Sequence, residues 1–141
     1  MADIFNKKRR SQIMAKIRGK GTSVERTLSF VLSELGLTYE QHYDSLPGTP
    51  DFVLSKRKVV IFTSGCFWHG HENCRRATLP TTNRAFWANK IKRNKKRDAR
   101  QRRLLRKMGW HVITFWTCTK ITGAKVRGRL ERVGIRIRRS K

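Results

Sequence analysis

Three cysteines and one histidine have the residue types and spacing of a metal site. Cys66, His71 and Cys74 lie within nine residues, and Cys118 follows much later in the chain. Three thiolates and one imidazole are a usual ligand set for structural zinc, which holds four ligands in a tetrahedron. Because such a closed set leaves no position for a water molecule, we expect a structural Zn²⁺ site and not a catalytic one.

The fourth ligand is the least constrained by the sequence, because Cys118 stands far from the other three and the spacing carries no information. His69 or His111 could take its place. The alternative interpretation of the whole set is buried free thiols beside an incidental histidine. An odd total of 3 cysteines and the absence of a Cys-x-x-Cys motif argue against a disulfide framework and against a redox site.

Acidic side chains are scarce, with 9 in the chain, so each one is informative. Asp51 follows Pro50 and opens a predicted strand, where a carboxylate oxygen is a suitable ligand for Mg²⁺. A divalent-cation site for phosphodiester chemistry in this basic chain would be built around that carboxylate. The alternative is an aspartate that only closes a proline-rich turn.

One histidine is a candidate for proton transfer. His69 lies inside the cysteine-rich segment, the Cys3His set does not need it, and an imidazole titrates near neutral pH. Glu25 has a competing structural explanation, because Thr22 and Glu25 form a helix capping box. His42 and His111 lie in strand-like segments, and we expect them to serve packing.

The hydrophobic pattern predicts the elements that must position these residues. A run of apolar residues at helical spacing from Val24 to Leu35 is the clearest signal, and Gly36 ends it. The pattern predicts a mixed α/β fold in a single domain over residues 1–141, with a basic N-terminal arm over 1–21 and a basic C-terminal tail over 120–141. The predicted elements are a short helix near 10–18, a helix over 23–35, a strand over 37–43, a hairpin of strands over 51–55 and 59–62, an irregular segment over 64–82, a helix from 83 to about 108, a strand over 110–116, and a final helix or tail from 120 onward.

The charge indicates the class of partner. The chain has 34 Lys and Arg against 9 Asp and Glu, a formal net charge of +25. A polyanion must neutralise such a surface, and nucleic acid releases counterions when it does so. The longest apolar run, over 59–62, is far too short to span a membrane, and no secretory signal opens the chain. We therefore expect a cytoplasmic nucleic-acid-binding protein without membrane association.

Two adjacent aromatics in the irregular segment could contact bases. Phe67 and Trp68 stand between two predicted metal ligands. Core packing is their ordinary role, but a zinc-held segment can present rings outward as wedges that enter between base steps.

These residues match a known family over almost the whole chain. The sequence resembles the very short patch repair endonucleases of bacteria, which act on DNA mismatches. The motifs that carry the resemblance are Arg10-Ser11-x-x-Met14, Leu46-Pro-Gly-x-Pro-Asp51-Phe, Val60-Ile-Phe-x-x-Gly65-Cys-Phe-Trp-His69-Gly-His71, Phe86-Trp87-x-x-Lys90-x-x-x-Asn94-x-x-x-Asp98 and Gly109-Trp110-x-Val-x-x-x-Trp116-x-Cys118.

The resemblance implies a fold and an activity. It implies a restriction-endonuclease-like fold, with a mixed sheet flanked by helices and a structural zinc. It implies an Mg²⁺-dependent endonuclease that nicks one strand of double-stranded DNA 5′ to the thymine of a T:G mismatch. Such mismatches arise by deamination of 5-methylcytosine. A monomer, a functional link to a DNA cytosine-5 methyltransferase and a place at the nucleoid when on DNA are also implied.

The resemblance also implies roles for individual residues. Asp51 and the carbonyl of Thr63 would bind Mg²⁺, His69 would act as general base, and Glu25 would support the site through water. The zinc ligands would be those suggested by residue type. The implied DNA contacts are Phe67, Trp68 and Trp87 as the intercalating wedge, and Met14, Lys90 and Asn94 near the mismatched pair.

One position departs from the family pattern. The residue after Thr63 is usually histidine in the family, and here it is Ser64. This departure keeps an alternative open, a zinc-stapled basic DNA-binding protein without efficient nuclease activity. A nuclease without mismatch specificity is a further alternative.

Overall fold

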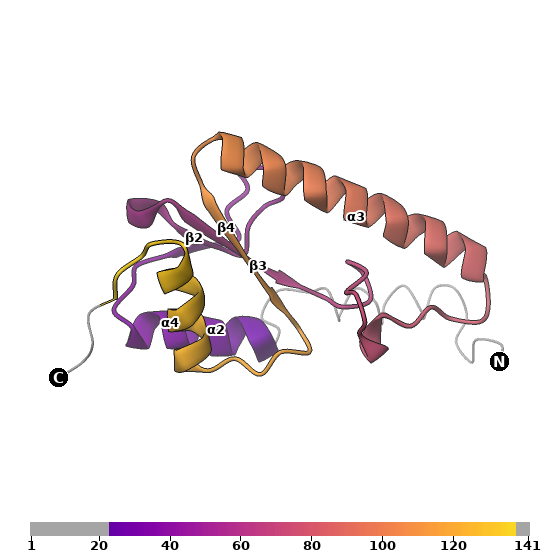
Figure 1. Cartoon of the computed structure of the whole chain (residues 1–141), viewed down its shortest axis with the longest axis horizontal. Helices are drawn as coiled ribbons and strands as arrows, with labels where there is room; N and C mark the ends of the chain where they lie inside the picture. The colour runs from indigo at the N-terminus through magenta and orange to yellow at the C-terminus, as the bar shows by residue number, and fades with distance from the viewer. Residues whose placement is uncertain (1–22, 138–141) are drawn as a thin grey trace.

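The computed structural model describes residues 23–137, which form one mixed sheet covered by helices on both faces (Figure 1). Met14 and the helix expected near 10–18 lie outside the described residues. The elements are α2 (Ser23–Glu34), β1 (Glu40–Gln41), β2 (Phe52–Leu54), β3 (Val59–Ser64), α3 (Arg84–Lys107), β4 (His111–Trp116) and α4 (Gly123–Arg132), with short 3-10 turns at Ser55–Arg57 and Arg75–Ala77.

The strands lie in the order β1-β2-β3-β4. The first three pair antiparallel, as the predicted hairpin requires, whereas β4 runs parallel to β3 with Ser64 opposite Trp116. A parallel partner needs a long crossover connection, and the irregular segment over 65–83 followed by α3 supplies it. The mixed sheet flanked by helices therefore confirms the predicted fold class.

Alternation along the strands divides the core into two layers. On one face, α2 and α4 pack against β2, β3 and β4 (Figure 1), and the buried residues include Leu28, Phe52, Ile61, Ile113 and Leu130. On the other face, the C-terminal part of α3 covers the sheet, and the layer contains Val53, Val60, Phe62 and Leu105.

The C-terminal stretch is part of the first layer. Of the two predicted alternatives, a helix or a tail, the structure has a helix: the side chain of Thr122 caps α4 by accepting from the backbone N–H of Lys125 at 3.2 Å. Val126 and Leu130 are fully buried, and Ile135 packs partly buried against the same core. The many basic residues of this segment made its apolar face hard to recognise from the sequence.

The first strand is shorter than predicted, with two residues in place of the expected segment over 37–43. His42 adopts a left-handed backbone conformation with φ of 52°, which ends the extended segment. Among the described residues, no helix has both the length and the apolarity that crossing a membrane requires.

Candidate active site and metal-ligand cluster

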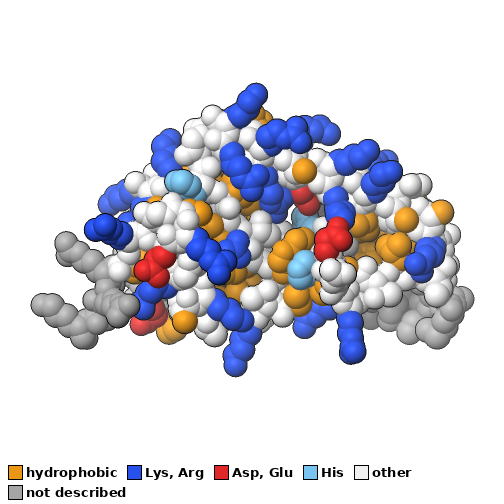
Figure 2. Space-filling model, in the orientation of Figure 1, with side chains coloured by type: hydrophobic (Ala, Val, Ile, Leu, Met, Phe, Trp, Pro, Cys, Tyr) orange, Lys and Arg blue, Asp and Glu red, His pale blue; other side chains and the backbone are white. Residues whose placement is uncertain are grey.

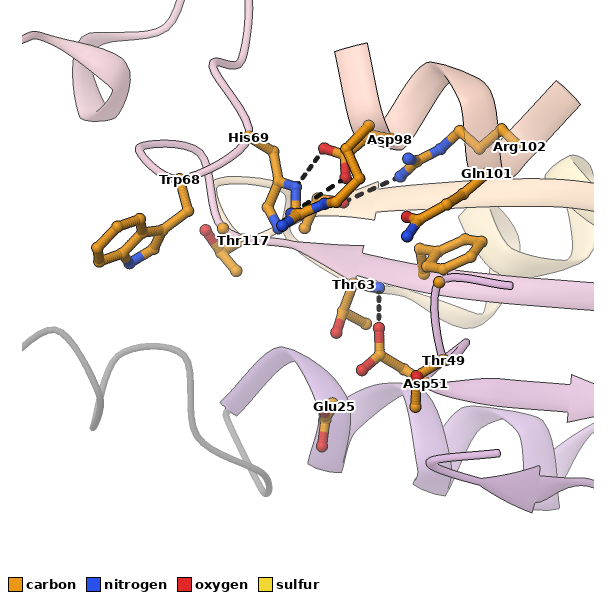
Figure 3. A pocket seen from close by; sticks show the side chains of 15 residues that line it. Glu25, Thr49, Asp51, Thr63, Trp68, His69, Asp98, Gln101, Arg102 and Thr117 are labelled. Atoms are coloured by element: carbon orange, nitrogen blue, oxygen red, sulfur yellow. Dashed lines mark hydrogen bonds and ion pairs between the residues drawn. The ribbon is translucent and has the colours of Figure 1, made fainter. Parts of the chain in front are cut away.

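A pocket of about 430 Å³ opens where β3 ends and β2 begins (Figure 3). Carboxyl ends of parallel strands are the usual place for sites in α/β sheets. Side chains from α2, from the loop before β2, from β3, from the segment after it and from α3 line this pocket. The lining residues include Glu25, Asp51, Thr63, Ser64, Trp68, His69, Arg97, Asp98 and Arg102.

Asp51 and Glu25 form an acidic pair in this pocket. The β2–β3 pairing brings the backbone N–H of Thr63 to 2.7 Å from Oδ2 of Asp51, to which it donates. Glu25 projects from α2 and is 4% exposed. Burial, together with the neighbouring charge of Glu25, raises the pKa of Asp51 to about 6 against the opposing hydrogen bond from Thr63. The buried carboxyl group of Glu25 beside the half-buried one of Asp51 fits a divalent cation, which would offset their repulsion.

His42 joins this acidic pair, in contrast to the packing role expected from the sequence. Its backbone N–H donates to the carbonyl of Asp51 at 3.0 Å, and its Nε2 lies 3.5 Å from Oε2 of Glu25. Ligand atoms of Glu25, His42 and Asp51 lie within 4.8 Å of one another. No local signal could have found His42, because only the pairing of β1 with β2 brings it to Asp51.

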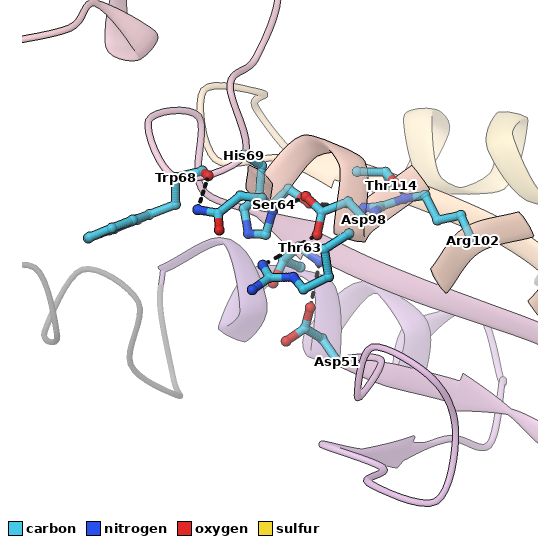
Figure 4. A network of polar contacts seen from close by, with 10 residues as sticks. Asp51, Thr63, Ser64, Trp68, His69, Asp98, Arg102 and Thr114 are labelled. Atoms are coloured by element: carbon cyan, nitrogen blue, oxygen red, sulfur yellow. Dashed lines mark hydrogen bonds and ion pairs between the residues drawn. The ribbon is translucent and has the colours of Figure 1, made fainter. Parts of the chain in front are cut away.

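His69 is oriented by an acidic residue from α3. Nδ1 of His69 lies 2.5 Å from Oδ2 of Asp98 (Figures 3 and 4). Although burial opposes ionisation of Asp98, its hydrogen bond with His69 and nearby cations lower its pKa below the ordinary value. A carboxylate on Nδ1 fixes the tautomer of the ring and leaves Nε2 as the nitrogen for proton transfer. Asp98 lies in one of the motifs that carry the family resemblance, but no role was predicted for it.

The four predicted zinc ligands come together beside this pocket. Ser64 pairs with Trp116, and a cysteine follows two residues after each of them, Cys66 and Cys118. The pairing therefore brings the two thiols to the same end of the sheet. This register supplies the proximity that sequence spacing did not. Ligand atoms of Cys66, His71, Cys74 and Cys118 lie within 4.8 Å of one another, and Sγ of Cys118 is 3.5 Å from Nδ1 of His71. His69 is held by Asp98 instead, and His111 lies at the opposite end of β4.

The donor set and its surroundings fit a tetrahedral metal ion. The ring of His71 stacks on Trp116 with centroids 4.1 Å apart, which fixes the plane of the imidazole. Burial raises the pKa of the Cys66 thiol, but hydrogen bonds with Thr117 and Cys118 outweigh that effect and lower it to about 7. A thiol with this pKa loses its proton readily to solvent and binds a metal ion as the thiolate.

The metal-ligand segment also packs on α3. At Gly70, where φ is +60°, a Cβ atom would stand 2.7 Å from Ile91 Cγ2 and from Lys95 Cδ, so only glycine allows this approach. The side-chain amide of Asn94 donates to the carbonyl of Trp68 at 3.0 Å (Figure 4). Asn94, which was expected near the mismatched base pair, thus also holds the segment that carries His69.

The predicted wedge residues form one aromatic cluster. Phe67, Trp68 and Trp87 pack edge to face with centroids 5.4 to 5.8 Å apart. Trp68 and Trp87 are 7% and 8% exposed, whereas Phe67 is half-buried. The wedge role of these rings therefore stays a prediction, and Trp68 and Trp87 would have to leave this packing to enter between bases. Lys90 lies half-buried on α3, one turn from Trp87.

Ser64 lies at the back of the pocket and is 2% exposed. Its Oγ accepts from Nη2 of Arg102 at 3.3 Å (Figure 4). Arg102 reaches the pocket from α3, and nothing in the sequence distinguishes it from the many other cations of that helix.

Comparison with known proteins identifies relatives over most of the chain. The family model described as DNA mismatch endonuclease Vsr matches residues 2–76. The DNA mismatch endonuclease Vsr of Escherichia coli (strain K12) is 40% identical over 136 residues, which cover 93% of this chain and 86% of the relative. The type II nicking enzyme V.NmeAIP of Neisseria meningitidis serogroup A is 40% identical over 94% of both chains. The type II nicking enzyme V.XorIIP of Xanthomonas oryzae pv. oryzae is 39% identical over 84% of this chain and 86% of the relative.

Proposed function

The chain belongs to the DNA mismatch endonuclease Vsr family, and from that premise we propose that it nicks one DNA strand 5′ to the thymine of a T:G mismatch. Membership makes it a DNA mismatch endonuclease of the nicking type, a hydrolase. What we propose beyond family membership is the T:G mismatch as the target, Mg²⁺ and Zn²⁺ as the cations, and the residues that bind them or act on the DNA. The observation that carries it is one pocket that holds both the acidic pair of Asp51 and Glu25 and the pair of His69 and Asp98.

Hydrolysis requires a water molecule to attack phosphorus while the bond to the leaving sugar oxygen breaks, and that oxygen takes up a proton from solvent. In the proposed reaction, Nε2 of His69 takes the proton of the attacking water, and Asp98 stabilises the resulting imidazolium. The sheet fixes Asp51 through Thr63, whose own carbonyl would face the same cation. Asp51 and Thr63 would hold Mg²⁺, with Glu25 acting through water. When bound, this cation offsets the negative charge that develops on the phosphate.

The cluster of Cys66, His71, Cys74 and Cys118 would hold structural Zn²⁺. Its role in the proposal is mechanical, because it ties the segment that carries His69 to the end of β4. Phe67 and Trp68 belong to that segment and pack on Trp87 of α3, and this cluster would unstack the mismatched pair. Lys90 and Asn94 on α3, with Met14 from the undescribed N-terminal residues, would contact the DNA near it.

The wider setting of the proposal follows from the family. We infer a monomer in the cytoplasm, found at the nucleoid when on DNA, that acts where a DNA cytosine-5 methyltransferase creates 5-methylcytosine. Lys and Arg side chains are spread over the visible face of the molecule (Figure 2), which supports double-stranded DNA as the substrate. A DNA-binding protein without efficient nicking is the second candidate, and Ser64 in place of the usual histidine is the observation that favours it.

A nicking assay on matched duplexes tests the proposal. Two labelled duplexes differ only in a T:G or a T:A pair and are incubated with the protein and Mg²⁺, over a panel of flanking sequences. We expect one nick, 5′ to the mismatched thymine, in the T:G duplex alone. Asp51→Asn should abolish nicking but preserve binding, because Asn keeps the shape and the acceptor for Thr63 but loses the charge.

Two results would contradict this function. Equal cutting of both duplexes would indicate a nuclease without mismatch specificity. Tight binding of the T:G duplex with no nick, in any flanking sequence, would favour the DNA-binding candidate.

A further inference from the structure

Arg102 is held in a fixed position inside the candidate active site. Its Nε donates to Oγ1 of Thr114 at 3.2 Å, and its Nη2 donates to Oγ of Ser64 at 3.3 Å (Figure 4). The guanidinium carbon lies 4.7 Å from the centre of the Phe62 ring. Two hydrogen bonds and a ring on one face leave the group little freedom, although it reaches the pocket from a long side chain.

Burial and charges from several elements act on Arg102. Burial lowers its pKa most strongly, Asp98 of α3 and Asp51 before β2 oppose this, Arg106 adds to it, and the net shift is downward. The guanidinium nevertheless keeps its charge at any pH at which the protein is folded. Arg97, the other arginine lining the pocket, pairs with Asp98 at 3.5 Å and is 45% exposed. Arg102 is therefore the better fixed cation of the two.

The donors of Arg102 exceed its described partners. A guanidinium has five N–H groups, and the contacts with Thr114 and Ser64 use two of them. None of the three carboxylates that line the pocket, those of Glu25, Asp51 and Asp98, accepts a described hydrogen bond from Arg102. Arginine with donors to spare, fixed beside the acidic pair and His69, suits an oxyanion with several acceptor atoms.

The geometry points to Arg102 as a further catalytic residue, which donates to a non-bridging oxygen of the phosphate that is cut. This inference rests on the proposed nicking reaction and deepens it. A fixed donor to an oxygen that gains charge in the transition state lowers the barrier, because it needs no reorganisation during the reaction. Ser64 has a part in this arrangement, since its small side chain leaves room for the guanidinium and its hydroxyl orients it.

Variants of neighbouring arginines on one helix test the inference. Arg102→Gln removes the charge and keeps much of the stem that packs on Phe62, Arg102→Lys keeps the charge but loses the planar fork, and Arg103→Gln is the control. Arg103 is exposed and does not line the pocket, so its substitution removes the same unit of positive charge from the protein without touching the site. The readouts are single-turnover nicking of the T:G duplex, its dissociation constant and the melting temperature of each variant.

We expect Arg102→Gln to lower the nicking rate constant about 100-fold and Arg102→Lys at least about 10-fold. Dissociation constants should stay within about threefold of the Arg103→Gln value, since the gain is made in the transition state. Nicking by both Arg102 variants at the control's rate would overturn the inference and leave the proposed function intact. Failure of the wild-type chain to nick any duplex would overturn the proposed function first, and the role of Arg102 with it.

Discussion

At the scale of single residues, the most informative group is the carboxyl of Asp51. Its pKa of about 6 means that near neutral pH the protein holds a charge that the fold itself disfavours. Groups of this kind mark sites whose environment is arranged for a ligand and not for stability. The raised pKa of Asp51 beside Glu25 is thus stronger support for a cation site than the Pro50-Asp51 sequence alone.

The pH dependence of stability follows from this pKa. In the folded state it is raised from 3.8 to about 6, so the ionised form is destabilising above pH 6 and the penalty vanishes below pH 3.8. Asp51→Asn should therefore raise the free energy of unfolding above pH 6 by up to about 3 kcal/mol, with no difference near pH 3.5. Urea denaturation at pH 3.5, 5 and 8 measures this.

The same group predicts the acid limb of the nicking rate. Because catalysis needs ionised Asp51, the rate should rise with pH through about 6, and added Mg²⁺ should move the midpoint to lower pH by competing with the proton.

A wild-type protein that is more stable to urea than Asp51→Asn at pH 8 would contradict the assignment of a raised pKa to Asp51.

At the scale of elements, the metal-ligand cluster joins the end of β4 to the segment that begins after β3. From the other side, α3 holds the same segment through the hydrogen bond of Asn94, the pair of Asp98 with His69 and the close packing at Gly70. The ion pair of Lys95 with Glu72 is exposed, and exposed ion pairs contribute little to stability. The cluster is therefore expected to stabilise the position of His69 together with these contacts to α3.

Removal of the metal tests this dependence. Cys118 is exposed, so Cys118→Ser disturbs little packing and acts through the metal. We expect it to lower the melting temperature by at least about 10 °C and to increase hydrogen exchange over residues 66–78. A strong chelator should reproduce the loss in the wild-type chain and add nothing in the variant. A chelator effect of equal size in both proteins would show that Cys118 is not a ligand.

Several elements could be predicted from the sequence because their signals are local. The helix over 23–35, the hairpin and the helix from 83 to about 108 each depend on periodicity or turn residues within one segment, and all three are present. What could not be predicted arises between segments. The β3–β4 register brings Cys118 to Cys66, the β1–β2 pairing brings His42 to Asp51, and the α3 crossover brings Asp98 to His69 and Arg102 to Ser64.

At the scale of the whole molecule, we expect the net charge to determine the affinity for DNA and the pocket to determine the reaction. The net charge of +25 far exceeds the few cations that line the site. Most of it therefore serves binding that does not depend on sequence.

The salt dependence of binding measures this division. Because each neutralised phosphate releases counterions, the affinity for a fully paired duplex should fall by about 10³-fold between 50 and 200 mM salt. The ratio of T:G to T:A affinities should change much less, since recognition of the mismatch depends on stacking and hydrogen bonds. A ratio that falls in step with the affinity would indicate that the preference for the mismatch is itself electrostatic.

The pairing of Ser64 with Trp116 has a further consequence for how such a chain can change over evolutionary time. Cys66, His71 and Cys74 lie at the start of the crossover, and Cys118 follows the end of β4, so the four ligands meet across the paired strand ends. Insertions or deletions between Cys74 and α3 leave the strands and the four ligands in place, at a small entropic cost. A single residue inserted between Trp116 and Cys118, by contrast, would move the thiol away from its three partners. Length variation is thus tolerated in the loop before α3 and not in the two residues after each strand.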